Sequence, residues 1–483
     1  MIQDDRTVVS LERFGSQIPG LDVVLGGGFF SSGVYILQGA PGSGKTIMAN
    51  QICYGHVKEG GRAIYVTLLS ESHTRMLQHL RSLDFFDEAI IPDQLSYISA
   101  FHDLEQEGLK GLMMVLRREM RAQQVSLLVL DGLVAAAESA QTDRELKKFI
   151  HEVQTSAVFH GCTVFLLTSG SPQRVNAEHT MVDGIIELED RLFDARAERS
   201  LHLHKFRGAD SLRGKHAFQI THEGLHVYPR VEALFNRPPA AADEKAGLST
   251  GISQLDALIG SSGLPASSAT VLVGSTGTGK TTFCLHFLAQ SSAAEPGLFF
   301  GFFESPDRLR TRAGSLGLDL DRLEADGNVA LMWHAQGEHV LDQLGHSLLD
   351  AVSNRGVKRL VIDGLSGFFE AATYPERIGR FFACLINELR ARGVTMLMTL
   401  EAGDMLGSLT PIHYGVSAMV DNLLLLRFID AGVRARRLIT IMKMRNSNYD
   451  PSLYEISMSA QGMSIDGQFA HAENELIPSA KPV

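Results

Sequence analysis

The chain has 483 residues, of which 45% are hydrophobic and 20% are charged, and its formal net charge is −11. This composition excludes a disordered or fibrous protein, and the length favours two or more domains over a single core. The acidic charge argues against general binding of nucleic acid, although a local basic groove is still compatible with it.

The chain shows no sign of a membrane or secretory segment. Its N-terminal stretch MIQDDRTVVSLERFG is charged and lacks the apolar core of a signal peptide. No run reaches the roughly 18–20 apolar residues of a membrane span. Cys53, Cys162, Cys284 and Cys384 are far apart and lie in apolar contexts, which is typical of free thiols in a reducing compartment. We therefore expect a cytoplasmic protein.

The sequence contains a domain-sized internal repeat. GAPGSGKT at 39–46 recurs as GSTGTGKT at 274–281, an offset of 274 − 39 = 235. Three further blocks recur in the same order: GLDVVLGGGF with SQLDALIGSSGL, LLVLDGL with LVIDGLSG, and HKFRG with MKMRN. This spacing indicates a tandem domain duplication. We expect the following organisation: a first domain at 1–236, a linker at 237–246, a second domain at 247–466 and a loose tail at 467–483.

Short apolar runs alternate with helix-like stretches within each repeat. In the first repeat, strands are expected at 34–39, 63–69, 127–132 and 163–169, and a helix at 144–161. In the second repeat, the strands are TVLVGS, LFFGFF, LVIDG and TMLMTL, and a helix is expected at 377–393. Buried strands separated by helices predict two α/β domains, each a mainly parallel sheet flanked by helices.

Both G-x-x-x-x-G-K-T segments have the pattern of a Walker A phosphate-binding loop. Backbone N–H groups would surround the phosphates of ATP, Lys45 and Lys280 would reach the β- and γ-phosphates, and Thr46 and Thr281 would offer hydroxyls to Mg²⁺. A glycine-rich turn is the alternative, but both copies follow a strand and precede a helix pattern. The predicted ATP-binding residues are Gly39, Ala40, Pro41, Gly42, Ser43, Gly44, Lys45 and Thr46, and Gly274, Ser275, Thr276, Gly277, Thr278, Gly279, Lys280 and Thr281.

Asp131 and Asp363 end apolar strands in the manner of a Walker B carboxylate. Each would act on the metal ion from the end of a buried strand. An Asp-Gly turn is the alternative, since Gly132 and Gly364 follow. Their similar distances from the Walker A loops favour Mg²⁺ binding.

A pair of cations comes near the end of each repeat, Lys205 with Arg207 and Lys443 with Arg445. Within each pair, the two side chains lie on one face of a strand. They would stabilise the charge of a nucleotide bound by a neighbouring subunit, which requires a ring. Solvated charges on an edge strand are the alternative. Their recurrence in both repeats favours the role in the neighbouring site.

The Walker elements, HKFRGADSLRGKHAFQITHEGLHVYPR at 204–230 and RRLITIMKMRNS at 436–447 resemble the KaiC family of double-domain ATPases in the RecA/RadA superfamily. The resemblance covers about 11–466. It implies RecA-like domains, a homo-hexameric ring with ATP between subunits, the four cations acting across interfaces, and slow ATP hydrolysis. Family members of the clock type also phosphorylate a Ser/Thr pair, whose positions fall here on Ser417 and Ala418.

The sequence departs from the family at its catalytic glutamates. The family carries two adjacent glutamates after the second strand, whereas here only Glu304 stands there in the second domain and Glu71 in the first. These two residues are the predicted catalytic carboxylates. Because the threonine of the phosphoacceptor pair is absent, we expect Ser417 to bond to the backbone rather than to be phosphorylated. The long charged tail that engages clock partners is also absent, so a clock role of the cyanobacterial kind is not expected, and the sequence does not identify regulatory protein partners.

Two other functions are considered. A recombination ATPase would need cations in the pore-facing stretches 169–182 and 401–419, but these contain one cation, Arg174, and nucleic-acid binding is therefore disfavoured. The densest basic run, RARR at 434–437, is expected to face solvent or a subunit interface. The other possibility is a scaffold that binds ATP and scarcely hydrolyses it.

Overall fold

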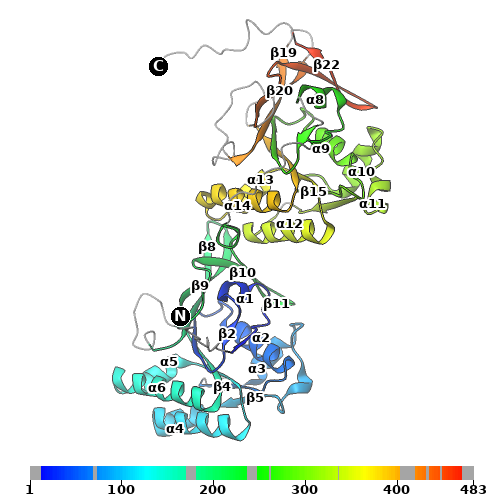
Figure 1. Ribbon diagram of the computed structural model, residues 1–483. Coiled ribbons are helices and arrows are strands. Elements are labelled where there is room, and N and C mark those ends of the chain that lie inside the picture. The colour runs from blue at the N-terminus through cyan, green and yellow to red at the C-terminus, as the bar shows by residue number, and fades with distance from the viewer. Residues whose placement is uncertain are drawn as a thin grey trace, which may run out of the picture. The chain divides into compact units, whose positions relative to one another are not determined.

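The computed structural model describes residues 12–68, 73–169, 181–236, 247–259, 263–335, 337–402, 419–430, 435–445 and 449–469. Within the chain are two compact units, Met1–Leu234 and Phe235–Val483 (Figure 1). Each unit contains one nine-stranded sheet, and the two sheets have the same topology. The predicted fold class, two tandem α/β domains with mainly parallel sheets, is confirmed.

The first domain's sheet joins six parallel strands to three antiparallel ones. Its order is β5-β4-β6-β7-β3-β8-β9-β10-β11, and the pairing changes from parallel to antiparallel at β8. The strands are β3 (Val34–Gln38), β4 (Ala63–Thr67), β5 (Leu95–Ser99), β6 (Leu127–Asp131), β7 (Thr163–Thr168), β8 (Gly184–Phe193), β9 (Arg196–Phe206), β10 (Lys215–Thr221) and β11 (Gly224–Tyr228); β1 (Arg13–Phe14) and β2 (Phe29–Phe30) form a separate ribbon.

Helices cover both faces of this sheet (Figure 1). One core cluster joins α2 to Tyr35, Leu37 and the antiparallel strands, and the other joins α4 and α6 to Val34 and Ile36. Successive residues of β3 therefore face opposite cores, as strand geometry requires. The helices are α1 (Leu21–Leu25), α2 (Lys45–Lys58), α3 (His73–Leu80), α4 (Phe101–Ala122), α5 (Leu133–Ser139), α6 (Asp143–His160), α7 (Val231–Leu234) and the 3₁₀ turn η1 (Glu88–Ile90).

The helix predicted at 144–161 illustrates how local sequence sets these elements. The Thr142 side chain accepts a bond from the Glu145 N–H at 3.2 Å and caps the N-terminus of α6. Gly161, in the left-handed region with φ 65°, ends the helix. Buried Leu146, Ile150 and Val153 recur at helical spacing and bind α6 to the sheet.

The second domain repeats the same order of strands, β16-β15-β17-β18-β14-β19-β20-β21-β22. Its strands are β14 (Ala269–Gly274), β15 (Gly297–Gly301), β16 (Val329–Trp333), β17 (Arg359–Asp363), β18 (Thr395–Glu401), β19 (Asn422–Asp430), β20 (Ala435–Met444), β21 (Tyr454–Ser459) and β22 (Gly462–Gln468), with a small ribbon of β12 (Gly247–Leu248) and β13 (Leu264–Pro265). The carboxyl ends of the parallel strands meet at one edge, where ligands bind in open α/β sheets.

Helices of the second domain also lie on both faces of its sheet (Figure 1). They are α8 (Ser253–Leu258), α9 (Lys280–Ala289), α10 (Pro306–Ser315), α11 (Leu320–Ala325), α12 (Leu341–Arg355), α13 (Ser366–Ala371), α14 (Ile378–Ala391) and the 3₁₀ turn η3 (Pro375–Arg377). Ser305 has extended backbone at the N-cap of α10 and Pro306 opens the first turn, as their sequence pattern indicates.

Candidate active site: two phosphate-binding loops

Each G-x-x-x-x-G-K-T loop connects the first parallel strand to a helix buried in the core: β3 to α2, and β14 to α9. Gly44 and Gly279 precede these helices with φ of 102° and 106°, a conformation that strains any residue with a side chain. A Cβ on Gly279 would also lie 2.1 Å from Cε of Met458. The glycines therefore permit the tight turn that exposes the first N–H groups of each helix to an anion.

The loop lysines adopt the same pose in both domains. Lys45 Nζ donates to the carbonyl oxygens of the first two loop residues at 2.7 and 3.0 Å, and Lys280 Nζ makes the same two bonds at the same distances. Burial lowers the pKa of both amines, while nearby carboxylates oppose this shift. A bound phosphate group would give each lysine an anionic partner and would favour the charged form of its amine.

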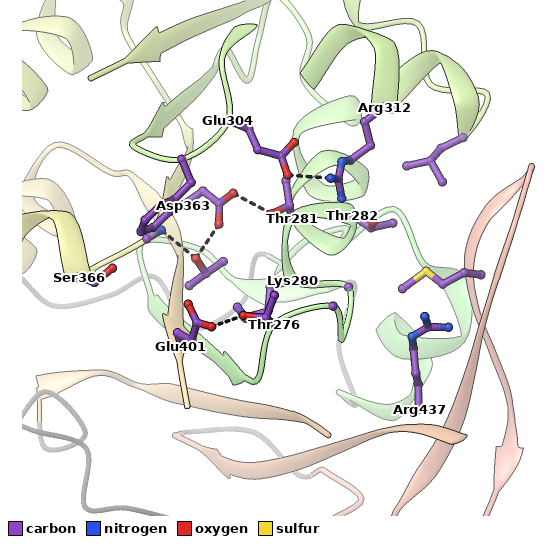
Figure 2. Close-up of a pocket in the computed structure, with 17 residues that line it drawn as sticks. Thr276, Lys280, Thr281, Thr282, Glu304, Arg312, Asp363, Ser366, Glu401 and Arg437 are labelled. Atoms are coloured by element: carbon purple, nitrogen blue, oxygen red, sulfur yellow. Dashed lines mark hydrogen bonds and ion pairs between the residues drawn. The ribbon is translucent and has the colours of Figure 1, made fainter. Parts of the chain in front are cut away.

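The second domain's loop borders a pocket of about 470 Å³ (Figure 2). It lies at the carboxyl edge of the parallel strands, and residues from β17, β18 and the segment after β15 line it together with the loop. The lining includes Thr276, Lys280, Thr281, Phe303, Glu304, Arg312, Asp363, Thr399, Glu401, Arg437 and Met458.

Asp363 contacts the predicted metal-binding threonine of its own domain. Thr281 Oγ1 donates to Asp363 Oδ2 at 2.9 Å, and Thr399 Oγ1 donates to Oδ1 at 2.6 Å (Figure 2). The Gly364 N–H in turn donates to Thr399 Oγ1 at 2.8 Å. Asp363 and Thr281 thus present neighbouring oxygen atoms, the ligand type that Mg²⁺ prefers.

Asp131 occupies the corresponding place at the end of β6 and also interacts with its loop threonine, Thr46, but its second hydroxyl partner is a tyrosine. The Tyr65 hydroxyl donates to Asp131 Oδ2 at 2.7 Å. Burial raises the pKa of Asp131, and the bond from Tyr65 and the charge of Lys45 oppose that shift. The two aspartates are therefore placed alike by the strands and held differently by side chains.

Glu304 opens into the same pocket as Lys280 and Asp363, and it forms an ion pair with Arg312 of α10 (Figure 2). Arg312 Nη2 lies 2.7 Å from Glu304 Oε1. Burial raises the pKa of the Glu304 carboxyl, the positive charge of Arg312 opposes this shift, and Asp363 adds to it. The carboxylate is therefore near the site but is engaged by a cation.

Two predicted residues lie outside the described residues, Glu71 and Ser417. The same is true of most of the stretches 169–182 and 401–419 and of the linker at 237–246.

The predicted cations lie away from the loop of their own domain, with the lysine of each pair level with the middle of the loop strand and the arginine level with its start. In the strand register, Lys443 stands level with Val271, the third residue of β14. The Arg445 N–H donates to the carbonyl oxygen of Asp421, which stands level with Ala269, the first residue of β14. Lys205 and Arg207 have the same positions relative to β3. At about 3.3 Å per residue, Arg445 is roughly 17 Å along the strand from the start of the loop.

Contacts within the domain orient the second pair. Lys443 Nζ donates to Val420 O at 2.7 Å, and Arg445 Nη1 lies 3.7 Å from Asp421 Oδ1. Arg445 is half exposed. Burial and the charge of Arg445 lower the pKa of Lys443.

Sequence reasoning missed several residues of the pocket, among them Thr399, Glu401 and Arg437. Thr399 and Glu401 reach it because β18 pairs with β14, and Glu401 accepts a bond from the loop's Thr276. Arg437 was expected to face solvent or an interface, but it lines the pocket with its guanidinium 5.2 Å from the centre of the Phe428 ring. A carboxylate at a strand's end is a usable sequence signal, whereas the position of Arg437 depends on the register of β20.

A phosphate-binding loop followed by a strand-end aspartate on a parallel sheet defines a P-loop nucleotide-binding domain, and this chain contains two. A sequence model of the KaiC family, described as an ATPase, matches residues 14–232 and again 248–469. The chain therefore belongs to the KaiC family of ATPases.

Relatives are similar over almost their whole length. Circadian clock protein KaiC3 of Synechocystis sp. is 24% identical over 96% of this chain and 94% of its own. Circadian clock oscillator protein KaiC of Picosynechococcus sp. is 23% identical over 96% and 92%, and that of Synechococcus elongatus is 23% identical over 96% and 91%. The similarity thus includes both domains.

Among the described residues, the structure contains no helix that is long and apolar enough to cross a membrane.

Proposed function

We propose that this chain is a Mg²⁺-ATP-dependent ring ATPase with slow hydrolysis and a regulatory or signalling role. The observation that carries the proposal is the convergence of Lys280, Asp363 and Glu304 on one pocket. The names of the relatives, which describe circadian clock proteins, support the regulatory role. Their similarity extends over both domains.

The donor atoms around the second loop fit a magnesium ion. Thr281 and Asp363 offer a hydroxyl and a carboxylate with oxygens 2.9 Å apart. When bound, Mg²⁺ neutralises charge on the β- and γ-phosphates. In the first domain, Thr46 and Asp131 would have the same role. Lys280 would bind the phosphates after leaving its present carbonyl partners.

Glu304 is the proposed group that orients and polarises the attacking water. Its ion pair with Arg312 competes with that task, which supports slow hydrolysis. Glu304→Gln should lower phosphate release from the second domain on the order of 100-fold, the range of general-base effects. Glu71→Gln tests the first domain in the same way.

Asp307→Asn is a matched control, because Asp307 lies on α10 with its side chain 92% exposed. It should leave the rate unchanged. Equal rates in the wild type, Glu71→Gln and Glu304→Gln would overturn both glutamate assignments and favour the ATP-binding scaffold.

The positions of the cation pairs support a ring with nucleotide between subunits. Along the strand, Arg445 is roughly 17 Å and Lys443 roughly 10 Å from the start of their own loop, so we infer that both side chains act on a neighbour's nucleotide. Lys205 and Arg207 would do the same in the first domain. Repeating such a head-to-tail contact closes a ring, and the family resemblance makes a hexamer the expected size.

Subunit mixing tests this arrangement. Lys280→Ala strongly weakens nucleotide binding in the second domain, and Arg445→Ala removes the cation that its neighbour needs. Randomly mixed rings contain both intact groups at about a quarter of interfaces, so activity should rise above that of either variant alone. Arg436→Ala, on the same strand and paired with Glu455, is the control that should retain activity. Mixtures without any gain would exclude the trans role.

Autophosphorylation would fall on Ser417. Mass spectrometry of the chain after incubation with Mg²⁺-ATP tests it, and an unmodified Ser417 would exclude a kinase activity at that residue.

A further inference from the structure

Three metal-ligating side chains converge on one face of the first domain's sheet, outside the nucleotide site. They are Glu187 of β8 and His202 and His204 of β9, whose donor atoms all lie within 4.8 Å of one another. Glu187 and His202 are direct partners in the strand register. The rings of His202 and His204 have centroids 4.3 Å apart.

A β-bulge brings the second histidine into this group. The pairing of β8 with β9 shifts between Ile185 and Ile186, so His204 is the extra residue on β9. Its Nε2 lies 2.7 Å from Glu187 Oε2. Bulges redirect a side chain in this way and are frequent beside functional sites.

Glu187 is a buried acid that forms no ion pair with a Lys or Arg among the described residues; Lys215, level with His202 on β10, pairs with Glu189 instead. Glu187 is 5% exposed, and among the described residues its hydrogen-bond partner is His204 alone. The next acid on that face, Glu189, contacts both Lys215 and Arg191. A carboxylate buried to this extent is normally paired with a cation or bound to a metal.

His202 is suited to be a ligand. The His202 ring stands opposite Glu187 in the strand register and beside the His204 ring, so both imidazoles can direct a nitrogen toward one ion. Two imidazoles with one carboxylate suit Zn²⁺ and related late transition metals rather than Mg²⁺, which prefers oxygen ligands.

We propose that Glu187, His202 and His204 form a binding site for a divalent transition-metal ion of the Zn²⁺ class. Ligand atoms of a tetrahedral zinc site are about 3.3 Å apart, so Glu187 and His204 need to separate only slightly. The three protein ligands leave a fourth position for water.

The second domain provides an internal comparison. It has the same bulge between Leu423 and Leu424, but Leu425, Thr440 and Met442 stand at the three positions. The site is therefore not required by the fold and belongs to the first domain alone. We expect one metal ion per chain.

The location gives the ion a structural consequence. Glu187 pairs with Gln38, the residue before the phosphate-binding loop, and His204 precedes Lys205. An ion here would link β8, which pairs with the loop strand β3, to β9, the strand that carries the trans lysine. This consequence rests on the proposed function, whereas metal binding does not.

The test is a direct titration of the tag-free, full-length chain after chelator treatment, without nucleotide. Co²⁺ should give the visible absorption of a four-coordinate site at one ion per chain, and Zn²⁺ but not excess Mg²⁺ should displace it. His202→Gln, His204→Gln and Glu187→Gln should each weaken Zn²⁺ binding at least about tenfold.

His151→Gln is the matched control, because His151 is exposed on α6 and should leave binding unchanged. Circular dichroism checks that each variant is folded, and the half-exposed histidine positions should tolerate glutamine. Absence of the Co²⁺ band in the wild type, or unchanged affinity in all three ligand variants, would overturn the proposal. ATPase activity is not used as a readout, so failure of the proposed function leaves the result interpretable.

Discussion

The two domains share backbone interactions down to single hydrogen bonds. Both sheets have the same strand order and the same bulge in the first antiparallel pair. The N–H groups of Val34 and Ala269 donate to Asp183 and Asp421, both at 2.9 Å. These bonds hold the start of each loop strand, so they are independent of what the pocket contains.

Side chains around the strand-end aspartates differ instead. Each aspartate interacts with its loop threonine, but the second hydroxyl comes from Thr399 for Asp363 and from Tyr65 for Asp131. In β7, Leu167 stands level with Asp131 and provides no hydroxyl. Duplication has thus preserved the backbone frame while the carboxylate environments diverged, and the two sites should respond differently to the same substitution.

The largest difference should come from removing one loop lysine at a time. Lys280→Ala should weaken ATP binding in the second domain by about 3 kcal/mol, roughly 150-fold, because charge-assisted bonds to phosphate are lost. Lys45→Ala should do the same in the first domain. Isothermal titration calorimetry should show one lost site in each variant.

Lys358→Ala is the control for this experiment, because Lys358 bonds to Arg392 O and does not line the pocket. Two sites of wild-type affinity in either loop variant would contradict the assignment of that loop.

The loops and parallel strands were predictable because their residue types are tied to local geometry. Gly44 and Gly279 adopt backbone angles that glycine tolerates, and apolar runs become buried strands. Thr399 and Glu401 were not predictable as pocket residues, since they reach the loop through pairing between strands more than 100 residues apart. The charged neighbours of Arg437 indicated solvent, and only the register of β20 against β19 brings it over Phe428.

Removing one hydroxyl group beside each aspartate should affect the two domains differently. Thr399→Val leaves Asp363 Oδ1 and the Gly364 N–H without their bonds, and Tyr65→Phe removes the bond to Asp131. Each should destabilise its own strand end by about 1–2 kcal/mol, so that amide exchange is roughly 5- to 30-fold faster.

Hydrogen–deuterium exchange with mass spectrometry reads the domains separately. Thr399→Val should affect β17 and spare β6, and Tyr65→Phe should do the reverse. Equal effects on both strands would refute the idea that these hydroxyls act locally.

The acid limb of the pH–activity profile should reflect protonation of the Glu304 carboxylate. Because burial raises the pKa of this carboxyl above its usual 4.5, its basic form is lost at a higher pH than for a free glutamate. Activity of the second domain, measured with Lys45→Ala present, should therefore fall as the pH drops through this raised pKa. Arg312→Ala removes a charge that lowers the pKa, so the limb should move to still higher pH.

Arg322→Ala controls for the loss of an arginine, because Arg322 pairs with Asp319 away from the pocket. An acid limb that stays in place, or moves to lower pH, in Arg312→Ala would show that Glu304 does not set it.

The smallest effect on stability is expected from a residue pair of the first domain, which occupies the positions that Arg437 and Phe428 have in the second domain. There Arg199 faces Asp190, with Nε 3.2 Å from Oδ2, and both side chains are 36% exposed. Solvent screens such a pair, so Arg199→Ala should lower stability by about 0.5 kcal/mol or less, a shift in Tm of under roughly 2 °C. Calorimetry of Arg199→Ala beside Arg191→Ala, another exposed arginine of this hairpin, checks the size. A fall in Tm of more than about 4 °C for Arg199→Ala but not for Arg191→Ala would show that the Arg199–Asp190 pair stabilises the first domain more than its solvent exposure indicates.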